Sequence, residues 1–215
     1  MIETTSASRP ATWLLRPKYL VGLFIVLVVV VAAGWLIGTV LRPYAFHGTV
    51  LQSPLPATNF TLTGHNGQPV TLSDFKGQVV LLYFGYTTCP DVCPTTLAEL
   101  HKTLQVLGTR AKDVQVMMVT VDPERDTVPV LAEYVTHFDA RFIGLTGTSD
   151  QIAQIATNYG VAYSRHEGPS ALGGYLVDHT ATVTAIDRQG HVRVIFPFNT
   201  PAAAIAADVD YLLNR

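Results

Sequence analysis

A long uncharged segment near the start of the chain constrains the fold more than any other feature. Residues 20–41 read LVGLFIVLVVVVAAGWLIGTVL and contain no charged side chain. An apolar helix of this length is long enough to cross the roughly 30 Å hydrocarbon core of a bilayer. The sequence therefore predicts one transmembrane helix, followed by enough chain for one domain with its own core.

The charges that flank this segment predict its orientation. Arg9, Arg16 and Lys18 precede it, and only Arg42 follows closely. Because positively charged flanks stay in the cytoplasm, we expect a single-pass protein of the plasma (inner) membrane with a cytoplasmic N-terminus and a periplasmic or otherwise extracytoplasmic C-terminal domain. A cleaved signal peptide is the alternative, since small residues at 31–34 would suit a peptidase. The uncharged run continues well past them, which favours an uncleaved anchor.

Composition divides the chain into four expected parts. These are a cytoplasmic segment (1–19), the transmembrane anchor (20–41), a linker that bears Pro, Gly and Ser (42–53), and a folded domain (54–215). The formal net charge is −2, and no block of Lys or Arg stands out. We therefore expect no nucleic-acid partner.

Hydrophobic periodicity predicts an alternating order of strands and helices in the folded domain. Alternation around Asn66-Gly67 indicates a β-hairpin, β-branched apolar runs indicate buried strands, and helical spacing of Leu and Ile indicates helices. The expected order is a hairpin (60–63 and 70–72), strand (79–86), helix (95–107), strand (114–121), helix (128–138), short strand (142–145), helix (149–159), hairpin (181–187 and 191–196) and closing helix (202–214). This order predicts an α/β sandwich around a mixed sheet.

Cys89 and Cys93 are the only cysteines of the chain, and they stand between a predicted buried strand and the helix that follows. The N-terminus of a helix favours a thiolate, because unpaired N–H groups and the helix dipole attract negative charge. A purely structural disulfide is the weaker interpretation, since so short a ring would remove little chain entropy. In an exported domain such a pair is a disulfide, is actively reduced, or binds a metal.

Three segments of the domain resemble the Sco/SenC family of copper-handling proteins in their order and spacing. They are GYTTCPDVCP (85–94), VDPERDT (121–127) and YLVDHT (175–180), and the resemblance covers roughly Ser53 to Tyr211. Thioredoxin-like relatives outside the family carry C-x-x-C or a lone cysteine. The resemblance implies a thioredoxin-like sandwich with an N-terminal β-hairpin, preceded by one transmembrane helix. It also implies a role in supplying copper to the dinuclear copper site of cytochrome c oxidase subunit II.

The metal ligands expected on this basis are Cys89, Cys93 and His179. Two thiolates are soft donors that suit Cu(I), and an imidazole lets the same site hold Cu(II). His179 stands at the head of the expected strand 181–186, where strand-end loops of an α/β sheet meet. Asp178 is expected to orient the imidazole from a second shell. Thioredoxin-like oxidoreductases usually have a cis-proline at this approach, and residues 178–181 contain none.

The other six histidines are expected to be solvated surface groups; they are His47, His65, His101, His137, His166 and His191. Zinc is less favoured than copper, because a structural zinc site takes four ligands and only three are convincing. Asp91 or Asp178 would have to be the fourth ligand, so zinc stays open at this point.

The acidic segment 122–126 has two interpretations. Asp122, Glu124, Arg125 and Asp126 follow a predicted strand directly. We expect a strand-end turn with an internal ion pair, and docking of a partner is the alternative.

Three functions compete on the sequence. The leading one is a copper chaperone, a transfer protein rather than an enzyme; whether it also reduces the cysteines of its acceptor is left open by the sequence. The first alternative is a thiol-disulfide oxidoreductase of the exported compartment, in which Cys89 and Cys93 are redox-active and His179 is dispensable. The second is a peroxidase-like enzyme, because residues 72–77 also resemble peroxiredoxin relatives. Other periplasmic copper carriers or thiol reductants are expected as further partners.

Overall fold

The computed structural model describes residues 17–40, 44–167 and 174–215. The chain separates into two compact units, Met1–Ala45 and Phe46–Arg215. In the first unit, α1 (Pro17–Val40) contains the stretch Val21–Gly38, which is long and apolar enough to cross a membrane and has a mean hydropathy of 2.8. The predicted apolar helix is therefore present, with a composition that suits an anchor or a signal sequence. Most of the expected segment 1–19, and residue 41, lie outside the described residues.

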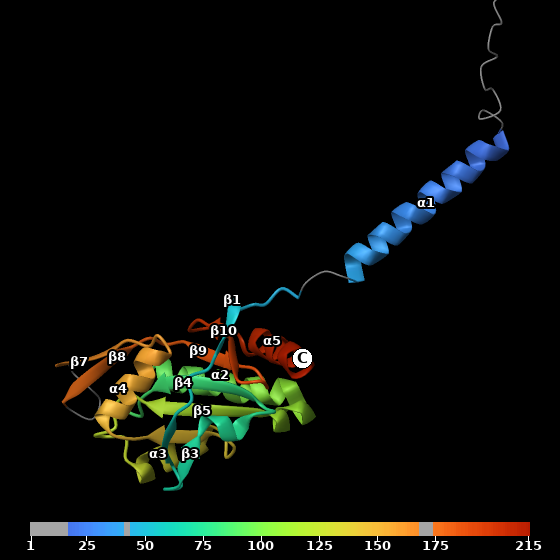
Figure 1. The fold of residues 1–215 in the computed structure, drawn as a ribbon. Coiled ribbons are helices and arrows are strands. Elements are labelled where there is room, and N and C mark those ends of the chain that lie inside the picture. The colour runs from blue at the N-terminus through green and yellow to red at the C-terminus, as the bar shows by residue number, and fades with distance from the viewer. Residues whose placement is uncertain (1–16, 41–43, 168–173) are drawn as a thin grey trace, which may run out of the picture. The chain divides into compact units, whose positions relative to one another are not determined.

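The second unit is built on an eight-stranded mixed sheet (Figure 1) with the strand order β1-β10-β9-β4-β5-β6-β2-β3. The central strands β4, β5 and β6 run parallel, and every other neighbouring pair is antiparallel. The strands are β1 (Thr49–Pro56), β2 (Thr61–Gly64), β3 (Pro69–Thr71), β4 (Val79–Gly85), β5 (Val114–Thr120), β6 (Ile143–Thr146), β9 (Val183–Ile186) and β10 (His191–Phe196).

Helices cover both faces of this sheet. They are α2 (Val92–Leu107), α3 (Val128–Phe138), α4 (Ser149–Asn158) and α5 (Ala202–Leu213), with short 3₁₀ turns η2 (Leu72–Phe75) and η3 (Gly108–Asp113). The ring of Phe84 in β4 lies 6.0 Å from that of Tyr159, which ends α4. Phe84 therefore faces α4. Neighbouring side chains of a strand point to opposite faces, so Tyr83 faces the other side of the sheet, where α2 lies. Because α2 contacts α3 and α5, these three helices form one layer and α4 lies on the other face.

The core centres on β4, the strand that leads to the cysteines. All seven of its residues are buried, as expected for a central strand with a helical layer on each face. Each large apolar side chain buried there contributes roughly 1.5–3 kcal/mol. The strand therefore gives the cysteine loop a rigid starting point.

Two features differ from the sequence-based expectation. Residues 49–53 were expected in a linker, but they belong to β1, which pairs with β10 in the sheet. A second, two-stranded sheet, the β7–β8 ribbon, joins β7 (Tyr163–Glu167) to β8 (Tyr175–His179). His166 therefore lies in β7, and His179 ends β8 rather than opening β9. Residues 168–173 between these two strands lie outside the described residues.

Candidate metal centre

The two cysteines lie where β4 gives way to α2. Cys89 is half-buried in the loop, whereas Cys93 is 0% exposed in the first turn of α2. The sulfur of Cys89 accepts a hydrogen bond from the backbone N–H of Cys93 at 3.4 Å. This sulfur thus occupies the place of a helix-capping side chain, which satisfies one of the free N–H groups of the helix end. The helix α2 begins at Val92, three residues earlier than its apolar spacing predicts.

His179 brings a nitrogen to these sulfurs from the β7–β8 ribbon. Its Nε2 lies 3.4 Å from the sulfur of Cys93. The ligand atoms of Cys89, Cys93 and His179 all lie within 4.8 Å of one another. The structure therefore brings together the three residues that the sequence analysis singled out, although 86 positions separate Cys93 from His179.

Aromatic rings and a backbone carbonyl fix the orientation of the imidazole. The rings of Tyr83 and Tyr86 meet it edge-on, with centroids 6.0 and 5.9 Å away. Its Nδ1 lies 3.4 Å from the carbonyl oxygen of Thr180. When a metal is bound, the proton of the imidazole can lie on Nδ1 and be donated to that oxygen, which leaves the lone pair of Nε2 for the metal; without a metal, Nε2 can carry the proton and donate it toward the sulfurs.

Asp178 lies apart from this arrangement. Its side chain is 80% exposed, and its carboxylate lies 3.5 Å from Nε2 of His166. Neighbouring residues in a strand point to opposite faces, so Asp178 and His179 diverge. The orienting contact that we expected from Asp178 is made by the carbonyl of Thr180, and the structure pairs Asp178 with His166.

The surroundings of the two thiols give them opposite acidities. A hydrogen bond from Cys93 lowers the pKa of Cys89 to about 3, against an opposing effect of burial and with further help from His179 and backbone N–H groups. Burial, followed by the hydrogen bond to Cys89, raises the pKa of Cys93. The reduced pair thus consists of a half-exposed thiolate at Cys89 and a buried thiol at Cys93.

This donor set matches a soft metal ion. Two sulfurs and one imidazole nitrogen suit Cu(I), and the same three donors can hold Cu(II). Neither of the carboxylates considered as a fourth zinc ligand, Asp91 and Asp178, belongs to the three-residue cluster. Both border a cavity of about 230 Å³ beside Cys89 and His179, so the cluster is open on one side.

Gly85 allows the close packing beneath the cysteines. A Cβ atom at this position would lie 3.0 Å from the sulfur of Cys93 and 2.7 Å from Cε1 of Tyr83. A larger residue would push the sulfur away from His179. The sequence motif includes Gly85, but its role depends on how β4 and α2 cross.

The acidic segment after β5 holds the site together. The buried carboxylate of Asp126 accepts hydrogen bonds from the hydroxyl of Thr120 (2.6 Å) and from both the hydroxyl (2.6 Å) and N–H (3.1 Å) of Thr87, two residues before Cys89. Asp122 has two further contacts. It pairs with Arg125, and it accepts a hydrogen bond at 2.7 Å from the hydroxyl of Tyr175, at the start of β8.

The ion pair between Asp122 and Arg125 confirms the expected internal ion pair. The segment also links the cysteine loop to the strand that carries His179.

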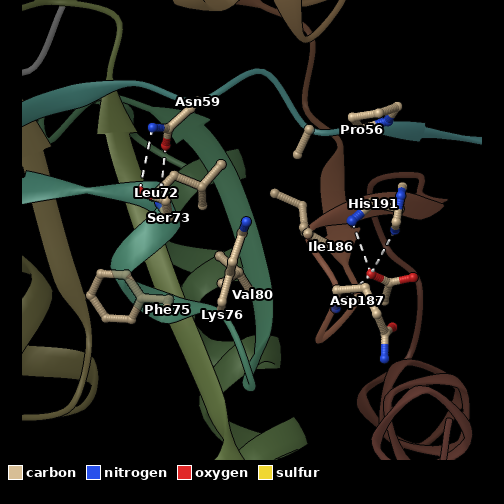
Figure 2. A pocket seen from close by; sticks show the side chains of 13 residues that line it. Pro56, Asn59, Leu72, Ser73, Phe75, Lys76, Val80, Ile186, Asp187 and His191 are labelled. Atoms are coloured by element: carbon tan, nitrogen blue, oxygen red, sulfur yellow. Dashed lines mark hydrogen bonds and ion pairs between the residues drawn. The ribbon is translucent and has the colours of Figure 1, made fainter.

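The remaining histidines lie elsewhere. His47 and His101 contact Asp208 and Asp139, and His65 accepts the N–H of Gly144. His191 contacts Asp187 at a cavity of about 220 Å³ (Figure 2). Val80, at the start of β4, lines this cavity, whereas the cysteines follow the other end of that strand. The carboxylate of Asp187 accepts hydrogen bonds from the backbone N–H groups of His191 and Gln189, at 2.9 and 3.0 Å. We therefore assign Asp187 a structural role in the turn between β9 and β10.

Comparison with known proteins agrees with this geometry. A sequence profile of the family SCO1/SenC matches residues 51–214. The human mitochondrial SCO1 homolog is 40% identical over 162 residues, which cover 73% of this chain and 52% of that protein. An SCO2-like protein of Rickettsia felis is 38% identical over 132 residues, 61% of this chain and 64% of that protein. The chain thus spans between half and two thirds of the length of these curated relatives.

Solved structures show the same fold. The copper-bound ScoI of Bradyrhizobium japonicum superposes with a TM-score of 0.66 at 37% identity, covering 74% of this chain and 99% of that one. The apo Sco1 of Thermus thermophilus gives a TM-score of 0.70 at 40% identity, covering 79% of this chain and 98% of that one. Because the family profile matches well over half of the residues, this chain belongs to the SCO1/SenC family.

Proposed function

We propose that the protein is a membrane-anchored chaperone that binds one copper ion through Cys89, Cys93 and His179 and delivers it to the dinuclear copper site of cytochrome c oxidase subunit II. The convergence of two sulfurs and one imidazole nitrogen within 4.8 Å carries this proposal. The donors are those that Cu(I) prefers and Cu(II) accepts. The copper-bound Bradyrhizobium structure, 37% identical to this chain, supports the choice of metal.

The half-buried position of Cys89 suits transfer as well as binding. Cys93 is fully buried, whereas Cys89 borders the open cavity of the site. A thiolate of the acceptor can therefore approach copper from the side of Cys89 and replace the ligands one at a time, with no change in oxidation state. The apolar helix α1 would hold the domain at the outer face of the membrane, where periplasmic copper carriers can load it.

Reduction of the acceptor's cysteines is a second candidate function, and the unequal acidity of the two thiols favours it. The Cys89 thiolate would attack an acceptor disulfide, form a mixed disulfide and release one acceptor thiolate. The sulfur of Cys93 would then attack that of Cys89, lose its proton and release the second acceptor thiolate. The acceptor gains two electrons, and the Cys89–Cys93 disulfide that forms must be reduced by an external thiol reductant.

Copper binding tests the proposal on the detergent-solubilised full chain. The reduced protein should bind one copper ion. Replacing both cysteines by serine should abolish Cu(I) binding, because serine offers only hard, weakly acidic hydroxyls. His179→Ala should retain some Cu(I) on the two sulfurs and lose the stable thiolate-to-Cu(II) absorption band. Stoichiometry by metal analysis and the Cu(II) spectrum are the two measurements.

His166→Ala is the matched control, because His166 lies in the same β7–β8 ribbon and outside the cluster. It should bind copper like the wild type. A wild-type Cu(II) spectrum in His179→Ala would show that His179 is no ligand. In cells, His179→Ala should lower cytochrome oxidase activity as a deletion does when copper is scarce. Rescue of the deletion by a thiol reductant, with no response to copper, would instead favour the oxidoreductase.

A further inference from the structure

The hydroxyl group of Tyr83 lies beneath the proposed metal site and makes no well-formed hydrogen bond with the described residues of the metal-free protein. Its side chain is 0% exposed; besides this burial, Cys93 and Thr96 are close enough to its oxygen to affect the pKa of Tyr83. A phenylalanine would fill the same core position without burying an unsatisfied polar group. The hydroxyl therefore calls for an explanation beyond packing.

The surroundings of the Tyr83 ring point to the proposed ligands. The ring meets the imidazole of His179 edge-on at 6.0 Å. The ring carbon that bears the hydroxyl and the sulfur of Cys93 lie 3.2 and 3.0 Å from one and the same point, the missing Cβ of Gly85. After burial, the negative charge of Cys93 is the largest cause of the raised pKa of Tyr83. Tyr83 therefore adjoins two of the three proposed ligands as a neutral hydroxyl.

A metal ion would supply the partner that this hydroxyl lacks. A thiol sulfur is a weak hydrogen-bond acceptor. A sulfur that binds a metal is a thiolate, and a charged acceptor makes a hydrogen bond roughly twice as strong as a neutral one. The sulfur of Cys93 is thus a poor partner before copper binds and a good one afterwards.

We propose that Tyr83 is a positioning residue of the copper site, whose hydroxyl donates a hydrogen bond to the sulfur of Cys93 once that sulfur holds copper. This inference rests on the proposed function, because it requires Cys93 to be a ligand. The bond stabilises the loaded state and holds the sulfur toward His179. It also lowers the energy of the sulfur electrons, so that the thiolate-to-Cu(II) absorption moves to higher energy.

Tyr83→Phe tests the inference in the full-length protein. Copper stoichiometry should stay at one ion per chain. The affinity for Cu(I), measured by competition with a chromogenic chelator, should fall roughly 10-fold to 100-fold, as expected for a lost hydrogen bond to a charged group. The thiolate-to-Cu(II) band should shift to longer wavelength. The melting temperature of the reduced, metal-free variant should be equal to or above that of the wild type, because an unsatisfied hydroxyl has been removed.

Tyr134→Phe is the matched control. Tyr134 also carries a buried hydroxyl without a described partner, and burial and then the negative charge of Cys93 also raise its pKa, but its ring packs against Phe138 in α3 and the described contacts do not join it to the three ligands. This variant should keep the copper affinity and spectrum of the wild type. If Tyr83→Phe also kept both, the inference would be wrong while the copper function stood. A parallel fall in copper affinity and metal-free stability would indicate a packing role and also contradict it. If the wild type bound no copper, the proposed function itself would fail.

Discussion

At the scale of single residues, Cys89 and Cys93 are chemically identical but stand in different surroundings. Cys89 caps the start of α2 and is half-buried, whereas Cys93 lies inside the first helical turn and is fully buried. Their spacing alone treats them as equivalent. In the structure, Cys89 is the anionic, accessible member of the pair, and Cys93 is the buried member that keeps its proton.

This asymmetry predicts an unusual dependence of reactivity on pH. Because the pKa of Cys89 is lowered to about 3, its alkylation by iodoacetamide in reduced, metal-free protein should change little between pH 5 and pH 8. An ordinary thiol, with a pKa of about 8.5, would react roughly tenfold faster with each pH unit in that range. Mass spectrometry of the alkylated peptide gives the rate. Cys93 should remain unmodified while the protein is folded.

The same pKa shift has a defined effect on stability. The pKa of Cys89 is lower in the folded than in the unfolded chain, so the unfolded chain binds more protons. Cys89 therefore contributes stability that rises as pH increases from about 3 toward the ordinary thiol pKa, and that is lost as pH falls through this window. Cys93→Ala removes the main hydrogen-bond donor to Cys89. In that variant the alkylation rate should again rise with pH near neutrality. A flat profile there would show that Cys93 does not lower the pKa.

The sequence predicted which residues meet at the site, but not the contacts that orient them. Two cysteines at a strand–helix junction and a histidine at a strand end carry a pattern, because backbone geometry places such positions together. The packing of Tyr83 against Cys93 and the contact of Thr180 with His179 depend on how distant elements cross. No local spacing records these contacts, and for the same reason Asp178 was expected in the place that Thr180 takes.

At the scale of elements, the acidic segment after β5 joins the two halves of the site. Asp126 holds Thr87 in the cysteine loop, and Asp122 holds Tyr175 in β8. Both carboxylates are 0% exposed, so their hydrogen bonds are made out of contact with water. The distance between the cysteines and His179 therefore depends on residues that would never touch the metal.

The substitution Asp126→Asn should weaken the hydrogen bonds that connect the acidic segment to the cysteine loop. An asparagine is neutral and presents an NH₂ group in place of one carboxylate oxygen, so at least one of the three hydrogen bonds that Asp126 accepts must be lost or reversed. We expect a loss of about 1–3 kcal/mol in the free energy of unfolding and a weaker affinity for Cu(I). Urea denaturation and chelator competition measure the two effects. The exposed Asp74→Asn serves as control and should alter neither; an unchanged Asp126→Asn would remove this segment from the site.

The fold was predictable where a local pattern decides the structure. The helix expected at 128–138 has those bounds, because its apolar stripe and flanking signals are complete in the sequence. The strand β1 was missed because Pro54 and Pro56 suggest a linker, yet an edge strand tolerates proline. The β7–β8 ribbon was missed because β7 (YSRHE) is mostly polar and charged and has neither the apolar run nor the alternation that indicates a strand. Both elements depend on a partner strand rather than on their own sequence.

At the scale of the whole molecule, the charges around α1 predict its direction in the membrane. Arg9, Arg16 and Lys18 precede the apolar run and only Arg42 follows closely, so we propose a cytoplasmic N-terminus and an external domain. Protease added to intact spheroplasts should digest residues 54–215. A cytoplasmic protein of the same cells, protected until lysis, is the control. Protection of the domain would show the opposite orientation, with the cysteines on the cytoplasmic side rather than in an oxidising compartment.

The edge strands of the sheet have a consequence for how many copies can share one membrane. β1 and β3 are the outermost strands, and both contain proline: Pro54 and Pro56 in β1, and Pro69 in β3. Proline has no N–H to offer to a further strand, and a blunted edge resists edge-to-edge pairing between chains. Proteins anchored in one plane meet far more often than proteins free in solution. In the membrane-anchored protein that we propose, β1, which follows the anchor, would thus also protect neighbouring copies from lateral aggregation.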